Sequence, residues 1–111
     1  MKRFAILVLV STMLLSTACN PTRESQLNET NTLIAKRAII AVDKYLDGDP
    51  DIRAARQAVT AEREKVDESD DRSFFLRADL TLLSTALLSE DAAKIRVARN
   101  TLAERAGMPD R

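Results

Sequence analysis

Apolar residues between positions 31 and 107 recur at spacings of three and four, which is the period of an amphipathic helix. The pattern divides into four segments separated by polar or helix-stopping residues. Two segments are apolar around most of their circumference, and two carry only a narrow apolar stripe. The sequence therefore predicts an all-α fold, either a small four-helix bundle or a pair of αα-hairpins.

The two broadly apolar segments are expected to form the centre of the bundle. The first runs from Ser25 or Asn31 to Asp47, and the second from Asp71 to Leu88. A helix that is apolar nearly all round is expected to be buried among several neighbours. Two narrow-striped partners would not cover both helices. Surplus apolar surface is then expected as a dimer interface or a groove for a partner helix, unless Ala-rich helices pack closely enough to hide it.

The two narrow-striped helices are predicted over Pro50–Glu68 and Glu90–Ala106. Glu62 falls on the apolar stripe of the first and interrupts it, and Glu90 and Lys94 form a favourable i,i+4 pair in the second. Capping chemistry sets the boundaries. Gly48 suits the C-terminus of the first helix, and Gly107 and Pro109 suit the end of the last. The predicted N-caps are Asp49 for the second helix, Ser69 or Asp70 for the third, and Ser89 for the fourth.

A weak internal repeat appears at a shift of 43 residues, where Leu33 aligns with Leu76 and Ile52–Gln57 with Ile95–Asn100. Duplication and coincidence are both open. Four arginines form i,i+3 pairs on the two narrow-striped helices, and they are expected on solvated outer faces, with an anion-binding or headgroup-binding face as the alternative. They are Arg53, Arg56, Arg96 and Arg99. Arg77 and Asp79, inside the most apolar helix, are expected to be partly exposed, with pairing to each other or lining of a functional groove as the alternatives.

Composition removes most catalytic and metal-dependent functions. The chain has no His, which excludes the commonest general base and zinc sites built from His and Cys. Its 17 basic and 17 acidic residues leave no basic excess for nucleic acid. The run Asp47–Asp51 resembles calcium ligands, but a helix stop followed by a helix start explains it better. We predict no catalytic site, no cofactor and no metal.

The first residues have the layout of a secretion signal. Lys2 and Arg3 precede an apolar run from Phe4 to Leu15, and small residues follow. The run is too short to span a bilayer, which needs about 20 residues. It ends at the only cysteine of the chain, Cys19.

The residues Leu15-Ser16-Thr17-Ala18-Cys19 resemble the lipobox of bacterial lipoproteins, with Ser16 where Leu is most common. The resemblance implies cleavage between Ala18 and Cys19 and lipidation of Cys19. Asn20 after the cysteine implies sorting to the outer membrane, facing the periplasm, rather than retention at the inner membrane. Cleavage by signal peptidase I, giving a secreted protein without lipid, is the alternative.

These observations divide the chain into three parts: a signal peptide at 1–18, a lipidated N-terminus and short polar tether at 19–30, and a helical domain at 31–107. The expected function is a membrane-anchored periplasmic lipoprotein. It would bind protein as an accessory or adaptor of an envelope assembly or exclusion system. A structural homo-oligomer of the envelope is the alternative, and an enzyme is not expected. The predicted partners are the membrane, through the lipid, and a protein or a second copy of the chain.

Overall fold

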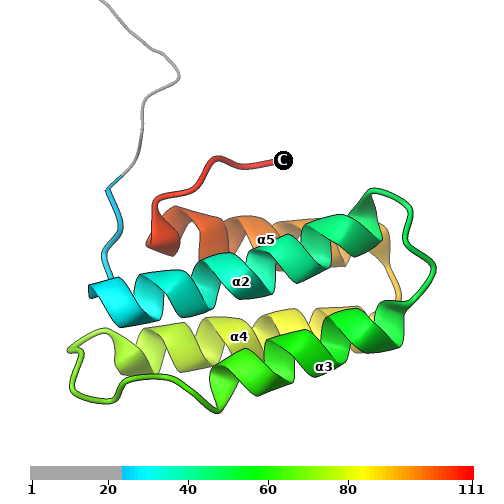
Figure 1. The fold of residues 1–111 in the computed structure, drawn as a ribbon. Coiled ribbons are helices and arrows are strands. Elements are labelled where there is room, and N and C mark those ends of the chain that lie inside the picture. The colour runs from blue at the N-terminus through cyan, green and yellow to red at the C-terminus, as the bar shows by residue number, and fades with distance from the viewer. Residues whose placement is uncertain (1–23) are drawn as a thin grey trace, which may run out of the picture.

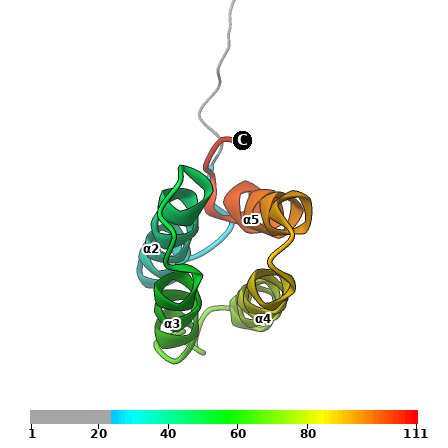
Figure 2. The ribbon, with the colours of Figure 1, turned by 90° about the vertical axis from the view of Figure 1, so that its right-hand side faces the viewer.

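A computed structural model describes residues 24–111, which form four helices and contain no strand. The helices are α2 (Glu29–Leu46), α3 (Ile52–Arg63), α4 (Ser73–Ser89) and α5 (Ala92–Ala106). Figure 1 shows them running alternately in opposite directions, and Figure 2 shows them end-on at the corners of a square. The prediction of an all-α four-helix bundle is confirmed. The signal segment 1–18, the cleavage residue Ala18 and the lipidation residue Cys19 lie outside the described residues.

We call the end of the bundle where α2 begins the proximal end, and the opposite end the distal end. The proximal end holds the start of α4 and the loop 64–72, and the distal end holds the connections 47–51 and 90–91 (Figure 1). Fully buried side chains from all four helices fill the space between these ends. The largest are Ile34, Ile39, Val42, Val59, Leu76, Leu80, Leu83, Leu87, Ile95 and Leu102.

Helix α2 packs on α3, α4 and α5, and α4 likewise packs on the other three helices. Neither helix is central, because each occupies a corner of the bundle and keeps one side exposed (Figure 2). A shift of 43 residues carries the bounds of α2 nearly onto those of α4, but it does not match their buried positions, because Ile39 is buried and the aligned Leu82 is exposed. For α3 and α5 the shift does match two buried positions, Ala55 with Ala98 and Val59 with Leu102.

The predicted N-caps are wrong by two residues at two helices. Asp51, not Asp49, caps α3 by accepting from the backbone N–H of Ala54 at 3.0 Å. Asp91, not Ser89, caps α5 by accepting from Ala93 at 2.9 Å. In both cases the earlier residue accepts from the N–H of the cap itself and so shapes the turn before the helix.

The start of α4 differs from prediction for another reason. Its N-cap position is Arg72, whose side chain makes no capping hydrogen bond. The predicted cap Asp70 does not replace it, because both carboxylate oxygens of Asp70 accept hydrogen bonds from other groups. One accepts from the N–H of Arg72 and the other from the N–H of Asn28. Glu90 ends α4 in a left-handed conformation (φ 56°), so it lies outside α5 and the predicted helical pair with Lys94 does not form. Gly48 and Gly107 follow α2 and α5 at positive φ, as predicted.

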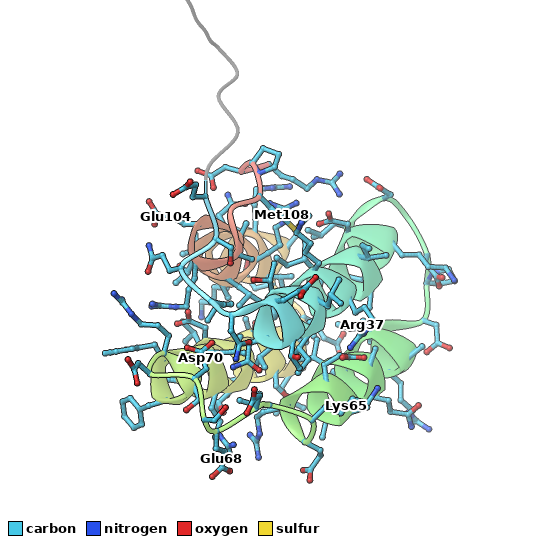
Figure 3. All side chains as sticks on the ribbon, turned by 60° about the vertical axis from the view of Figure 1, so that its left-hand side comes forward. Arg37, Lys65, Glu68, Asp70, Glu104 and Met108 are labelled. Carbon is cyan, nitrogen blue, oxygen red and sulfur yellow. The ribbon has the colours of Figure 1, made fainter. Side chains whose placement is uncertain are left out.

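A buried asparagine locks the loop 64–72 onto the start of α2. Asn31 is fully buried, and its amide donates to the carbonyl of Asp67 at 3.0 Å and to Asp70 Oδ2 at 3.1 Å. Its side-chain oxygen accepts from the N–H of Asp67 at 2.8 Å. Figure 3 shows Asp70 turned toward α2, whereas Glu68 points away from the bundle. Because every polar group of Asn31 has a partner, its burial fixes the position of α4 relative to α2.

Residues 25–27, which precede α2, also belong to the body. Leu27 is buried in the core, and the N–H of Gln26 donates to the carbonyl of Arg105 at 2.9 Å. The hydroxyl groups of Ser25 and Thr32 lie 2.6 Å apart. Part of the segment predicted as a tether thus packs against the ends of α2 and α5, and α2 itself begins at Glu29.

The charged residues inside the bundle are paired. Glu62 is buried on the α3 stripe and bonds to Arg37 at 3.1 Å and to Lys65 at 3.3 Å. Arg99 is only 3% exposed, and its guanidinium makes two bonds to Asp43, at 2.8 and 2.9 Å. The prediction that Arg99 lies on a solvated face is wrong, because it falls on the same stripe as Ile95 and Leu102.

Candidate functional site: an uncharged face on α4

The exposed face of α4 consists of uncharged residues, but the guanidinium of Arg63 on α3 donates to the hydroxyl of Thr81, at the middle of the helix, at 3.0 Å. The only charged residues of α4 are Arg77 and Asp79, and each leaves this face to bond elsewhere. Arg77 binds Glu68 at 2.7 Å and Asp79 binds Arg105 at 2.5 Å, so they do not pair with each other. The remaining exposed positions, which we call the α4 face, are Phe74, Phe75, Ala78, Thr81, Leu82, Thr85, Leu88 and Ser89.

An apolar groove of about 480 Å³ opens between α4 and α5 on the distal half of this face. Its walls include Leu82, 51% exposed, and Val97, 66% exposed. Its floor is formed by Ala86 and Ala98, whose short side chains leave the space unfilled. Lys94 is the only charged residue that lines it, and within residues 24–111 its ammonium group has no ion-pair partner.

A second, more polar hollow of about 370 Å³ lies on the other side of α4, against α3. Leu88 forms one wall, and Arg56 is the only charged residue that lines it. The distal half of the α4 face is therefore flanked by Arg56 on one side and Lys94 on the other, and the acidic residues Glu90 and Asp91 follow directly at its end.

The proximal end of the α4 face carries two phenylalanine side chains. Phe74 is 74% exposed, and its ring meets that of Phe75 edge-on at a centroid distance of 5.7 Å. The guanidinium of Arg105 lies 5.2 Å from the centre of the Phe75 ring while it also binds Asp79. This cation–π contact fixes Phe75, whereas Phe74 projects from the surface.

Acidic residues accompany the two phenylalanines. The loop before α4 contains Asp67, Glu68, Asp70 and Asp71. The hydroxyl and N–H of Ser69 hold the pKa of Asp67 below its usual value, and the N–H of Asn28 does the same for the pKa of Asp70. Both carboxyl groups are therefore ionised at neutral pH. Arg72 and Arg77 lie at the same end, so the proximal end of the α4 face is bordered by charges of both signs.

A smaller apolar surface lies on α2, at the diagonally opposite corner of the bundle (Figure 2). Leu33 and Ile40, one heptad apart, are 49% and 62% exposed. The surplus apolar surface predicted for the two broadly apolar helices is thus real, and it faces outward on two opposite sides.

The described residues offer no metal-binding constellation. No group of three or more His, Cys, Asp or Glu that could hold a metal occurs within residues 24–111. The run Asp47–Asp51 is a helix stop and start. Asp47 binds Arg111, whose guanidinium lowers the pKa of this carboxyl, and Asp51 caps α3. One of the two arginine pairs is also split, because Arg96 is exposed and Arg99 is buried, whereas Arg53 is exposed and Arg56 is half-buried.

The predicted site residues Ala18 and Cys19 lie outside the described chain, and none of the residues of the groove was predicted from sequence. No helix of residues 24–111 is long and apolar enough to cross a membrane. The chain matches no protein-family model, no curated protein and no solved structure. The site is therefore interpreted from its own geometry.

Proposed function

We propose that this chain is a membrane-anchored periplasmic lipoprotein that acts by binding protein. It would serve as an accessory or adaptor of an envelope assembly or an exclusion system, and not as an enzyme. The observation that carries the proposal is the outward-facing apolar surface on two opposite sides of the bundle, at Leu33 and Ile40 and along the α4 face. Two separate binding surfaces are what an adaptor requires, and exposed apolar patches mark interaction sites.

The anchor part of the proposal rests on the sequence that ends at Cys19. Because Ser25 already packs on the bundle, only the chain between Cys19 and Ser25 separates the lipid from the body. Six residues reach at most about 20 Å. The proximal end of the bundle would therefore stay near the membrane, in the outer membrane's periplasmic leaflet by the sorting implied by Asn20.

Lipidation is tested by metabolic labelling with a palmitate analogue. The wild-type chain should be labelled and the Cys19→Ala variant should not. Equal labelling of the two, or none in either, would refute the anchor and leave the secreted, non-lipidated protein as the explanation.

Adaptor function is tested by affinity purification from detergent-solubilised membranes. A stoichiometric partner should co-purify with the wild type and be lost with Ile40→Glu, which places a charge in the α2 surface. The matched control is Lys36→Gln, an exposed polar change on the same helix, which should retain the partner. A partner that survives Ile40→Glu would show that the α2 surface is not used.

A structural homo-oligomer is the second candidate function. It is favoured by one observation, namely that the α4 face carries apolar rings at one end and an apolar groove at the other.

A further inference from the structure

We propose that the hollow between α3 and α4 is a binding site for the phosphate group of a small molecule. The hollow has a volume of about 370 Å³ and is lined by Arg56, Gln57, Thr60, Ala61, Ser84 and Leu88. The proposal goes beyond the proposed function, because it concerns a small ligand and depends neither on the lipid anchor nor on the apolar surfaces.

The first argument is the isolated guanidinium of Arg56. This side chain is half-buried, yet it makes no hydrogen bond or ion pair with any group of residues 24–111. A partly desolvated charge is stabilised by an opposite charge, so an anionic ligand is the group that would complete this site. The other buried or half-buried arginines of the same residues each donate to an acceptor of the bundle: Arg63 to Thr81, Arg77 to Glu68, Arg99 to Asp43 and Arg105 to Asp79.

The second argument is the set of neutral polar side chains that share the hollow with Arg56. They are the hydroxyl groups of Thr60 and Ser84 and the amide of Gln57, and none of them makes a hydrogen bond within residues 24–111. By contrast, the hydroxyl of Thr101 on α5 donates to a carbonyl of its own helix at 3.0 Å. The three side chains in the hollow therefore remain able to donate to a ligand, from two different helices.

The number of donors distinguishes phosphate from carboxylate. A guanidinium binds a carboxylate through two parallel bonds, which use both of its oxygens. A phosphate offers further oxygens, which the hydroxyl and amide groups of the hollow can bind. Leu88 and Ala61 supply apolar walls for the carbon part of the same molecule.

No acidic residue lines the hollow. Glu62 on α3 is turned toward α2, where it binds Arg37. Glu64 and Glu90 follow the ends of α3 and α4. The guanidinium of Arg56 is therefore the only charge that lines the hollow and meets a ligand there directly.

Isothermal titration calorimetry of the full chain, purified in a non-ionic detergent, tests the site. Inorganic phosphate should bind with a dissociation constant of about 1 mM, as expected for a small ion held by one guanidinium and a few neutral donors. Arg56→Gln should weaken binding by about tenfold or more, because it removes the charge and the paired donors. Arg56→Lys keeps the charge alone and should fall between the two. Ser84→Ala should weaken binding by about threefold.

The matched control is Arg53→Gln, which changes an exposed arginine one turn earlier on α3 and should bind phosphate within about twofold of the wild type. Since Arg56 has no partner in the bundle, Arg56→Gln should keep the melting temperature of the wild type in the absence of phosphate. Its loss of binding is then not a loss of fold.

Two further probes identify the source of the phosphate group. Glycerophosphoglycerol is the water-soluble headgroup of phosphatidylglycerol and carries a phosphate diester. Tighter binding of this diester than of inorganic phosphate would support the site with a lipid headgroup as its ligand, and weaker binding would support a soluble phosphate. Acetate that binds as tightly as phosphate would overturn the assignment to phosphate. Equal phosphate binding by the wild type and Arg56→Gln, or no saturable binding up to about 20 mM phosphate, would overturn the site itself.

Discussion

The ion pair between Arg99 and Asp43 gives the clearest stability prediction. The Arg99 guanidinium is almost fully buried, donates twice to Asp43, and donates a third time to the carbonyl of Pro109 at 2.6 Å. Removing one partner of a buried pair costs about 3–5 kcal/mol. Asp43 keeps a second cation, Arg111, at 3.3 Å and is partly exposed. We therefore expect Arg99→Ala to cost about 3 kcal/mol, the lower end of that range.

The assay is urea unfolding followed by circular dichroism, on protein expressed without residues 1–18. The matched control is Arg96→Ala, one turn earlier on α5 and exposed, which should change the free energy of unfolding by less than about 0.5 kcal/mol. Arg99→Lys keeps the charge but loses the two-pronged geometry, so its loss should fall between the two. If Arg99→Ala unfolds within about 1 kcal/mol of the wild type, the pair does not hold α5 against α2 and the reasoning is wrong.

Three further predictions concern the proximal end and the turn between α4 and α5. Asn31→Asp should lower the free energy of unfolding by about 3 kcal/mol, because it removes two hydrogen-bond donations and adds a negative charge beside Asp70. Thermal denaturation measures this loss, and an unchanged midpoint would contradict the prediction. Because the folded-state pKa of Asp67 and of Asp70 is lowered, their stabilising effect is complete above about pH 4 and is lost as the pH falls further. Urea unfolding between pH 7 and pH 2.5 should show this loss, which Asp70→Asn should reduce. Glu90→Gly should raise the melting temperature slightly, because the left-handed backbone conformation of Glu90 costs about 1 kcal/mol for residues other than glycine. A lower melting temperature would show that no such strain exists.

The sequence predicted the number and order of the helices, and most of their bounds to within two residues, because apolar spacing and glycine stops are local signals. The predicted end of α3 at Glu68 is wrong, since the helix ends at Arg63. It could not decide which residue of an apolar pair points inward. In Ile39-Ile40 the first is buried and in Leu82-Leu83 the second is, and only the position of the neighbouring helices settles the choice. A groove or interface was expected, but the residues that line the groove were missed for this reason, since Leu82 has the same spacing as a core residue.

Buried polar residues were predicted unevenly. Glu62 was recognised because it interrupts an apolar stripe, and Arg99 offered the same signal, four residues after Ile95, but was assigned to the surface by residue type. Asn31 carried no local signal at all. Its partners lie 36 and 39 residues away in the loop before α4, so only the tertiary structure brings them together.

The contact between Gln26 and Arg105 has a consequence for the order in which the bundle can be completed. These residues are 79 positions apart, and the C-terminal Arg111 also binds Asp47 at the end of α2. When the chain emerges with its N-terminus first, whether from a ribosome or through a membrane, α2 forms first. The bonds that join the ends of α2 to Arg105 and Arg111 form last. Until α5 arrives, Leu27 and the side of α2 that packs on α5 stay uncovered. Chains truncated before α5 should therefore be sensitive to proteolysis.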